Sequence, residues 1–117
     1  MRATMQAEYV PKIKNAISRA VSYLDQILEA KDVEQETSED VLWHATEEIE
    51  YAAAVLSLTH GFIDFDPKFE DQDVRKEVGR EVPFARRLLL NALETLETSP
   101  KLSYEKLRHA VQILRNM

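Results

Sequence analysis

The stretch formed by residues 37–61, TSEDVLWHATEEIEYAAAVLSLTHG, constrains the fold more than any other part of the chain. Its side chains repeat at alternating spacings of three and four, which is the period of an α-helix. The first such row is Leu42, Ala45, Ile49, Ala52, Leu56 and Thr59, and a second row beside it is Val41, His44, Glu48, Tyr51, Val55 and Leu58. Two adjacent rows predict a long central helix that contacts neighbours on several sides.

The ends of this helix carry recognisable signals. Thr37 is a residue type that caps helix N-termini, and Asp40, three positions later, occupies the acidic position of a capping box. Gly61 is the residue expected in the left-handed conformation that terminates a helix. The pattern therefore predicts a helix that begins at Thr37 and stops at Gly61.

A first amphipathic helix precedes it. Pro11 suits the first turn of a helix, where its missing N–H has no partner to lose. The apolar residues then repeat with helical period from Ile13 to Leu28. We therefore predict a helix from Pro11 to near Asp32, with residues 1–10 as a loose lead-in.

Two more helices follow residue 61. The apolar period resumes near Glu70 and passes through Gly79 and Pro83, which predicts one long helix over residues 70–98 with a kink near Pro83. Leu102 and Leu107 flank Ser103 in the arrangement of a hydrophobic staple around a cap. The last helix is therefore predicted to start at Ser103.

The composition agrees with an all-helical domain. The chain has 117 residues, of which only two are glycine and four are proline, too few for the many turns of an all-β fold. Hydrophobic residues make up 44%, enough for a core. We predict an all-α, antiparallel four-helix bundle in which residues 1–117 form a single domain.

Several function classes are disfavoured by composition. The chain has no cysteine, so it offers neither a disulfide framework nor a thiolate metal site. A net charge of −6 disfavours nucleic acid and anionic membranes as partners. No apolar run reaches the length of a membrane span, and no signal-peptide core begins the sequence. We expect a cytosolic protein.

A histidine and two neighbours on the central helix form the first candidate site. His44, Glu48 and Tyr51 follow one another along one face, and we interpret them as a hydrogen-bonded polar cluster at a helix contact. A structural metal-binding bundle is an alternative reading. Bundle metal sites of the ferritin kind use Glu-x-x-His pairs, however, and the sequence contains none.

Two acidic pairs form the second candidate site. Glu47-x-x-Glu50 is followed by Glu70-x-x-Asp73, and carboxylates at i and i+3 project from the same side of a helix. The arrangement resembles the paired acidic motifs of all-α nucleotide pyrophosphatases of the MazG type. That resemblance implies an enzyme whose carboxylates hold Mg²⁺ beside a diphosphate. The chain departs from the family after the second pair, where VRKEVGREV replaces an apolar helical run.

The tryptophan carries the third candidate site and the main functional hypothesis. Trp43 lies outside both apolar rows of the central helix, and Phe62, Phe65 and Phe69 add an aromatic patch after its end. Tryptophan is enriched among the residues that anchor protein interfaces. We expect a non-catalytic interaction or assembly protein without a cofactor, forming a homodimer through these four residues or binding another protein. The Mg²⁺-dependent pyrophosphatase is the alternative.

Overall fold

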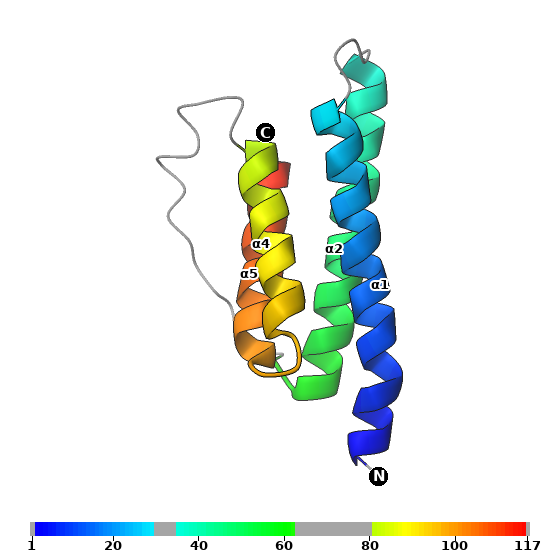
Figure 1. The fold of residues 1–117 in the computed structure, drawn as a ribbon, viewed down its shortest axis with the longest axis vertical. Helices are drawn as coiled ribbons and strands as arrows, with labels where there is room; N and C mark the ends of the chain where they lie inside the picture. The colour runs from blue at the N-terminus through cyan, green and yellow to red at the C-terminus, as the bar shows by residue number, and fades with distance from the viewer. Residues whose placement is uncertain (1, 30–34, 63–80, 117) are drawn as a thin grey trace.

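A computed structural model describes residues 2–29, 35–62 and 81–116, and this part of the chain contains four helices and no strand (Figure 1). The helices are α1 (Arg2–Glu29), α2 (Gln35–His60), α4 (Glu81–Thr95) and α5 (Pro100–Arg115). They pack lengthwise around one core. The predicted all-α four-helix bundle is confirmed.

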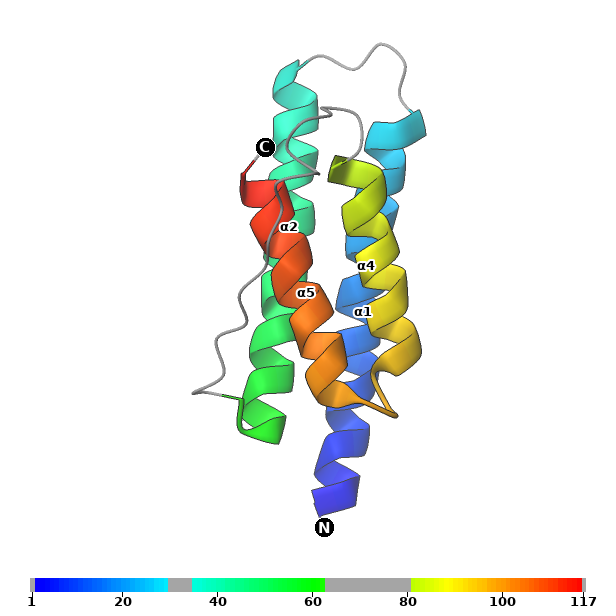
Figure 2. The same ribbon diagram turned by 90° about the vertical axis from the view of Figure 1, so that its left-hand side faces the viewer.

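The helices occupy the corners of a square in cross-section. Helix α1 packs against α2 and α4, and α5 packs against the same two helices (Figure 2). Each helix is antiparallel to both neighbours, while the diagonally placed α2 and α4 run in the same direction. Consequently α2 and α5 lie side by side and present one broad face of the bundle, which carries the site described below.

The first apolar row of α2 forms the middle of the core. Ala45, Ile49, Ala52 and Leu56 are fully buried. The second row has a different environment. Its members Val41, Glu48 and Val55 are half-buried, whereas His44, Tyr51 and Leu58 are exposed. The first row therefore forms the core side of α2. The second row lies at the edge of the core, and half of its members are exposed to solvent.

Helix α1 begins earlier than the sequence predicts. It starts at Arg2, so the predicted loose lead-in over residues 1–10 is wrong and Pro11 lies inside the helix. A proline there removes the hydrogen bond to the carbonyl of residue 7. Tyr9 and Val10 are partly buried against the core, and this tertiary contact helps to hold the helix on the N-terminal side of the proline.

The end of α2 matches the prediction and its start does not. Gly61 has φ +73°, and its N–H and that of Phe62 donate to the Ser57 carbonyl at 2.8 and 3.0 Å. This is the predicted left-handed terminator. Because α2 already begins at Gln35, Thr37 lies within the helix, and the prediction that it caps the helix is wrong. The predicted end of the first helix near Asp32 lies outside the described residues.

Pro83 lies in the first turn of α4, which begins at Glu81. A proline in this position leaves no helix hydrogen bond unmade, because the first N–H groups of a helix have no partner within it. Residues 70–80 of the predicted third helix, and with them the predicted kink, fall outside the part of the chain that the structure describes.

Helix α5 starts three residues before its predicted beginning. Its N-cap is Ser99 and its first residue is Pro100, so the predicted cap at Ser103 is wrong. Ser103 is instead fully buried, and its hydroxyl donates to the Ala92 carbonyl of α4 at 2.8 Å. This bond ties the first turn of α5 to the last turn of α4.

We expect Ser103→Ala to lower the free energy of unfolding by about 0.5–1.5 kcal/mol, because it removes a buried hydrogen bond between two helices. Urea denaturation followed by circular dichroism measures this change. Ser22→Ala is the matched control, since Ser22 is exposed in the middle of α1 and alanine is the better helix former. Equal effects from the two substitutions would show that the bond to Ala92 contributes nothing.

Candidate functional site

A groove lies between α2 and α5 on the surface of the described residues. It consists of two adjoining cavities of about 310 and 520 Å³, both of which are lined by Glu50 and Arg115. The smaller cavity is also lined by Glu39, Leu42, Trp43, Thr46, Glu47 and Leu114. The larger one is also lined by Ala53, Ala54, Ser57, Leu58, Tyr104, Arg108 and Val111. We call this continuous depression the α2·α5 groove.

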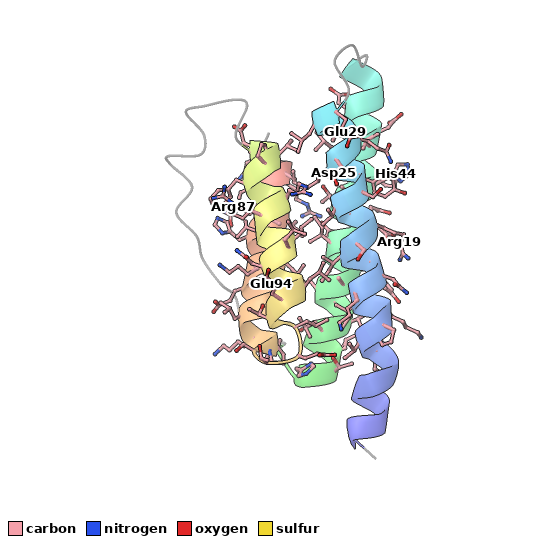
Figure 3. All side chains as sticks on the ribbon, in the orientation of Figure 1. Arg19, Asp25, Glu29, His44, Arg87 and Glu94 are labelled. Carbon is pink, nitrogen blue, oxygen red and sulfur yellow. The ribbon has the colours of Figure 1, made fainter. Side chains whose placement is uncertain are left out.

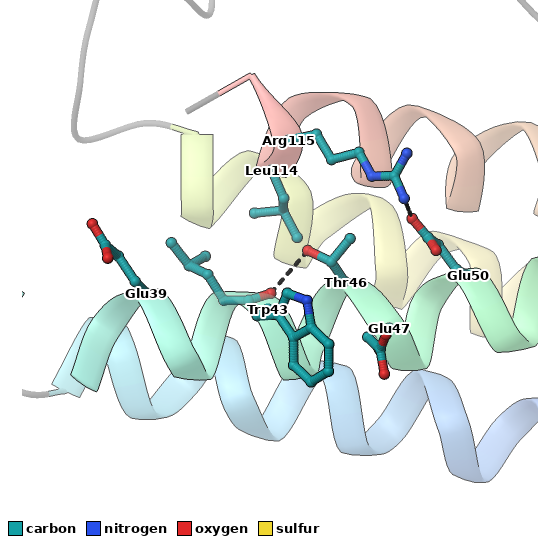
Figure 4. A pocket seen from close by; sticks show the side chains of 8 residues that line it. Glu39, Trp43, Thr46, Glu47, Glu50, Leu114 and Arg115 are labelled. Carbon is teal, nitrogen blue, oxygen red and sulfur yellow. Dashed lines mark hydrogen bonds and ion pairs between the residues drawn. The ribbon is translucent and has the colours of Figure 1, made fainter. Parts of the chain in front are cut away.

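Trp43 lies on the α2 side of the smaller cavity (Figure 4). It is 59% exposed, although indole is among the most costly side chains to leave in water. Leu114 contributes apolar surface from α5, and the Thr46 hydroxyl is occupied within the helix because it donates to the Leu42 carbonyl at 2.8 Å. The cavity therefore combines an apolar interior with an aromatic wall.

The other aromatic contacts of this region point toward α1. The ring of His44 meets Trp43 edge-on at 5.2 Å between centroids and stacks on Tyr23 of α1 at 5.7 Å. These contacts fix the position of the indole from one side only. The opposite side of Trp43 faces the groove.

The residues of the predicted polar cluster lie along the boundary between α1 and α2. Glu48 forms an ion pair with Arg19 of α1, His44 stacks on Tyr23, and Tyr51 is 47% exposed. Figure 3 shows His44 and Arg19 on the same side of the bundle. Each of the first two side chains thus has a partner on α1, and the cluster serves to align the two helices.

Glu50 and Arg115 form an ion pair that bridges the groove from α2 to α5. Their side chains are 40% and 63% exposed, so water screens the pair and its contribution to stability is small. Its position matters more than its strength. The pair lines both cavities and places an acid and a base where they adjoin.

The predicted Mg²⁺ ligands are divided between described and undescribed parts of the chain. Glu47 is exposed on α2, Glu50 is paired with Arg115, and Glu70 and Asp73 lie outside the described residues. Within residues 2–29, 35–62 and 81–116, no three histidine or carboxylate side chains gather closely enough to hold a metal ion. Glu50 in particular already has a cationic partner.

Phe62 is the one member of the predicted aromatic patch that falls within the described residues, and it lies far from the tryptophan along α2. Phe62 is half-buried, with its ring 5.7 Å from His60 and 5.3 Å from Tyr104, while Phe65 and Phe69 lie outside the described residues. At 1.5 Å per residue, roughly 28 Å of helix separates Trp43 from Phe62. Trp43 therefore lies in the N-terminal half of α2, whereas Phe62 follows its C-terminal end.

The α5 side of the groove was not predicted from the sequence. Tyr104, Arg108, Val111 and Arg115 line it at spacings of four, three and four. This row lies next to the buried row Ser103, Leu107, Ala110 and Leu114. A second row beside the core row of an amphipathic helix is the signal that could have identified these residues.

Comparison of the chain with models of protein families, with curated proteins and with solved structures gives no significant match. None of the helices that the structure describes combines the length and apolar character needed to cross a membrane. The functional argument therefore rests on the geometry and chemistry of the α2·α5 groove.

Proposed function

We propose that this chain is a non-catalytic interaction or assembly protein that forms a homodimer through the α2·α5 groove. The observation that carries the proposal is the exposure of large apolar side chains along one helix. Trp43 is 59% exposed and Leu58 75%, and both belong to α2. Trp43 and Leu58 line the two ends of the same groove.

Exposed apolar groups in a depression favour association. Complete burial of a large apolar side chain is worth about 1.5–3 kcal/mol, and a two-fold dimer buries each such residue twice. Apolar surface that covers more than a few hundred Å² is unusual on monomers. We expect the interface to bury more than roughly 1,000 Å² in total, with Trp43 and the ion pair of Glu50 and Arg115 within it.

The ion pair between Glu50 and Arg115 supports interaction over Mg²⁺ chemistry. A carboxylate that pairs with a guanidinium has to give up that partner before it can coordinate a metal ion. A cytosolic location forms part of the proposal, because a chain without cysteine suits a reducing compartment.

Sedimentation equilibrium at micromolar concentration tests the proposal, and we expect twice the 13.5 kDa mass of one chain. Trp43 is the only tryptophan in the sequence, so its fluorescence reports on this surface alone. We expect its emission to shift to shorter wavelength as the concentration rises, because dimerisation removes the indole from water. The mass of a single chain would overturn the proposal.

A pair of leucine variants locates the interface. We expect Leu58→Ala to raise the dimer dissociation constant by roughly tenfold or more, because it removes two buried leucine side chains per dimer. Leu28→Ala is the matched control, since Leu28 is 45% exposed at the end of α1 and away from the groove. A dimer that survives both Leu58→Ala and Trp43→Ala uses another surface.

A further inference from the structure

The two walls of the α2·α5 groove carry opposite charges. Helix α2 contributes the carboxylates of Glu39, Glu47 and Glu50. Helix α5 contributes the guanidinium groups of Arg108 and Arg115. The face is therefore acidic along one helix and basic along the other, with the apolar interior of the groove between them. A face with this pattern is complementary to a copy of itself in one orientation and not in another.

Two orientations of a two-fold axis in the interface bring identical faces together with the helices of the two subunits aligned. An axis perpendicular to the helices places α2 on the α2 of the partner subunit and α5 on its α5. An axis parallel to the helices places each α2 on the α5 of the partner subunit. Both bury the same groove, so apolar burial alone does not distinguish between them.

Charge distinguishes them clearly. If the perpendicular axis passes through the ion pair of Glu50 and Arg115, Glu50 lies against Glu50 of the partner subunit and Arg115 lies against Arg115 of the partner subunit. Like charges opposed in an interface are strongly unfavourable. With the parallel axis, the acidic α2 wall of each subunit meets the basic α5 wall of the other.

We infer that the two-fold axis of the dimer runs parallel to the helices, so that each α2 packs on the α5 of the partner subunit. This inference rests on the homodimer proposed above. Rotation about this axis leaves the position of each residue along the length of the bundle unchanged. Because Glu47 and Arg115 line the same cavity, Glu47 meets Arg115 of the partner subunit. Leu58 lines the other cavity and meets the wall that contains Arg108 of the partner subunit.

This arrangement gives the exposed side chains specific roles. Trp43 covers Leu114 of the partner subunit, and its ring lies within reach of a guanidinium group, which favours the face of an indole. The ion pair between Glu50 and Arg115 becomes part of a network of three charges, because Glu47 of the partner subunit approaches the same arginine. Exclusion of water strengthens such a network relative to the exposed pair seen in the single chain.

Cross-linking of single-cysteine variants tests the orientation, and the chain suits it because it has no cysteine of its own. The variants are Glu47→Cys, Ala54→Cys and Arg115→Cys in the full chain. Each variant is mixed with an affinity-tagged form of one of the other two, so that cross-links between different variants can be told from cross-links of a variant to itself. A short bismaleimide is the reagent, since it tolerates looser geometry than a disulfide. We expect Glu47→Cys to cross-link to Arg115→Cys, and neither variant to cross-link to itself.

A different product overturns the inference. With the perpendicular axis through the middle of the groove, Glu47→Cys would cross-link to Ala54→Cys instead. If sedimentation shows a dimer but none of the three variants cross-links, the dimer uses another face. That result overturns the inferred axis but not the homodimer. A monomer by sedimentation would overturn both the orientation and the proposed function.

Charge reversal gives a second, independent readout. We expect Glu47→Lys and Arg115→Glu each to raise the dimer dissociation constant by roughly three- to tenfold, because each places like charges together at two symmetric positions. A mixture of the two variants pairs Lys with Glu and Glu with Arg across the interface, so we expect it to associate more tightly than either variant does with itself. Tighter self-association of Glu47→Lys would contradict the inferred axis.

Discussion

We expect Leu56→Ala to lower the free energy of unfolding by about 2–5 kcal/mol, the range for removal of a fully buried leucine side chain. Leu56 is 0% exposed in the core, where no polar group or water replaces the three carbon atoms that the substitution removes. Since a domain of this size has about 5–15 kcal/mol of total stability, the loss is a large fraction of it. Guanidinium or urea denaturation of the variant measures the effect.

Leu58→Ala is the internal control for this experiment. It makes the same chemical change two residues further along the same helix, at a side chain that is 75% exposed. We expect it to change the stability of the monomer by less than about 0.5 kcal/mol. In the proposed dimer, association stabilises the original protein more than the Leu58→Ala variant. The difference in their stability therefore grows with protein concentration by mass action. A concentration-independent loss as large as that of Leu56→Ala would contradict the assigned burial.

The second large effect concerns small core residues on α1 and α2, the helix pair that packs most closely. Ala16 and Ala20 of α1 and Ala45 and Ala52 of α2 are all fully buried, and small side chains allow two helices to approach closely. We expect Ala52→Leu to lower the free energy of unfolding by about 1–3 kcal/mol, because a packed core has no room for a larger side chain. Thermal or denaturant unfolding measures the change.

Ala54→Leu is the matched control for overpacking. Ala54 is exposed on α2, and leucine is nearly as good a helix former as alanine, so we expect little change in monomer stability. If Ala52→Leu were neutral or stabilising, the junction of α1 and α2 would contain unfilled space. That outcome would contradict the close approach that we infer from the alanines.

The periodicity of the sequence determined which segments are helical and which side of α2 is buried. Ala45, Ile49, Ala52 and Leu56 were predicted as one row, and all four are fully buried. The prediction succeeded because a helix fixes the direction of each side chain once its period is known. Gly61 was predicted as a terminator for a local reason as well, since its positive φ is readily adopted only by glycine.

Helix starts were predicted less well, because several residue types can cap a helix and tertiary contacts choose among them. Pro11 marked an acceptable start, yet contacts of Tyr9 and Val10 with the core extend α1 beyond it. At α5 the sequence predicted a cap at Ser103 inside a hydrophobic staple, whereas the helix begins at Pro100 after Ser99. Ser103 is buried against α4, a contact that depends on a neighbouring helix.

The candidate site depends still more on tertiary structure. The sequence by itself identified Trp43 as a residue outside the core of α2, and its 59% exposure agrees with that. It could not identify the groove, because a groove belongs to two helices and the order of helices around a bundle is not encoded in the period of any one of them. Only the packing of α2 beside α5 brings Glu50 to Arg115, residues 65 positions apart, and opposes an acidic wall to a basic one.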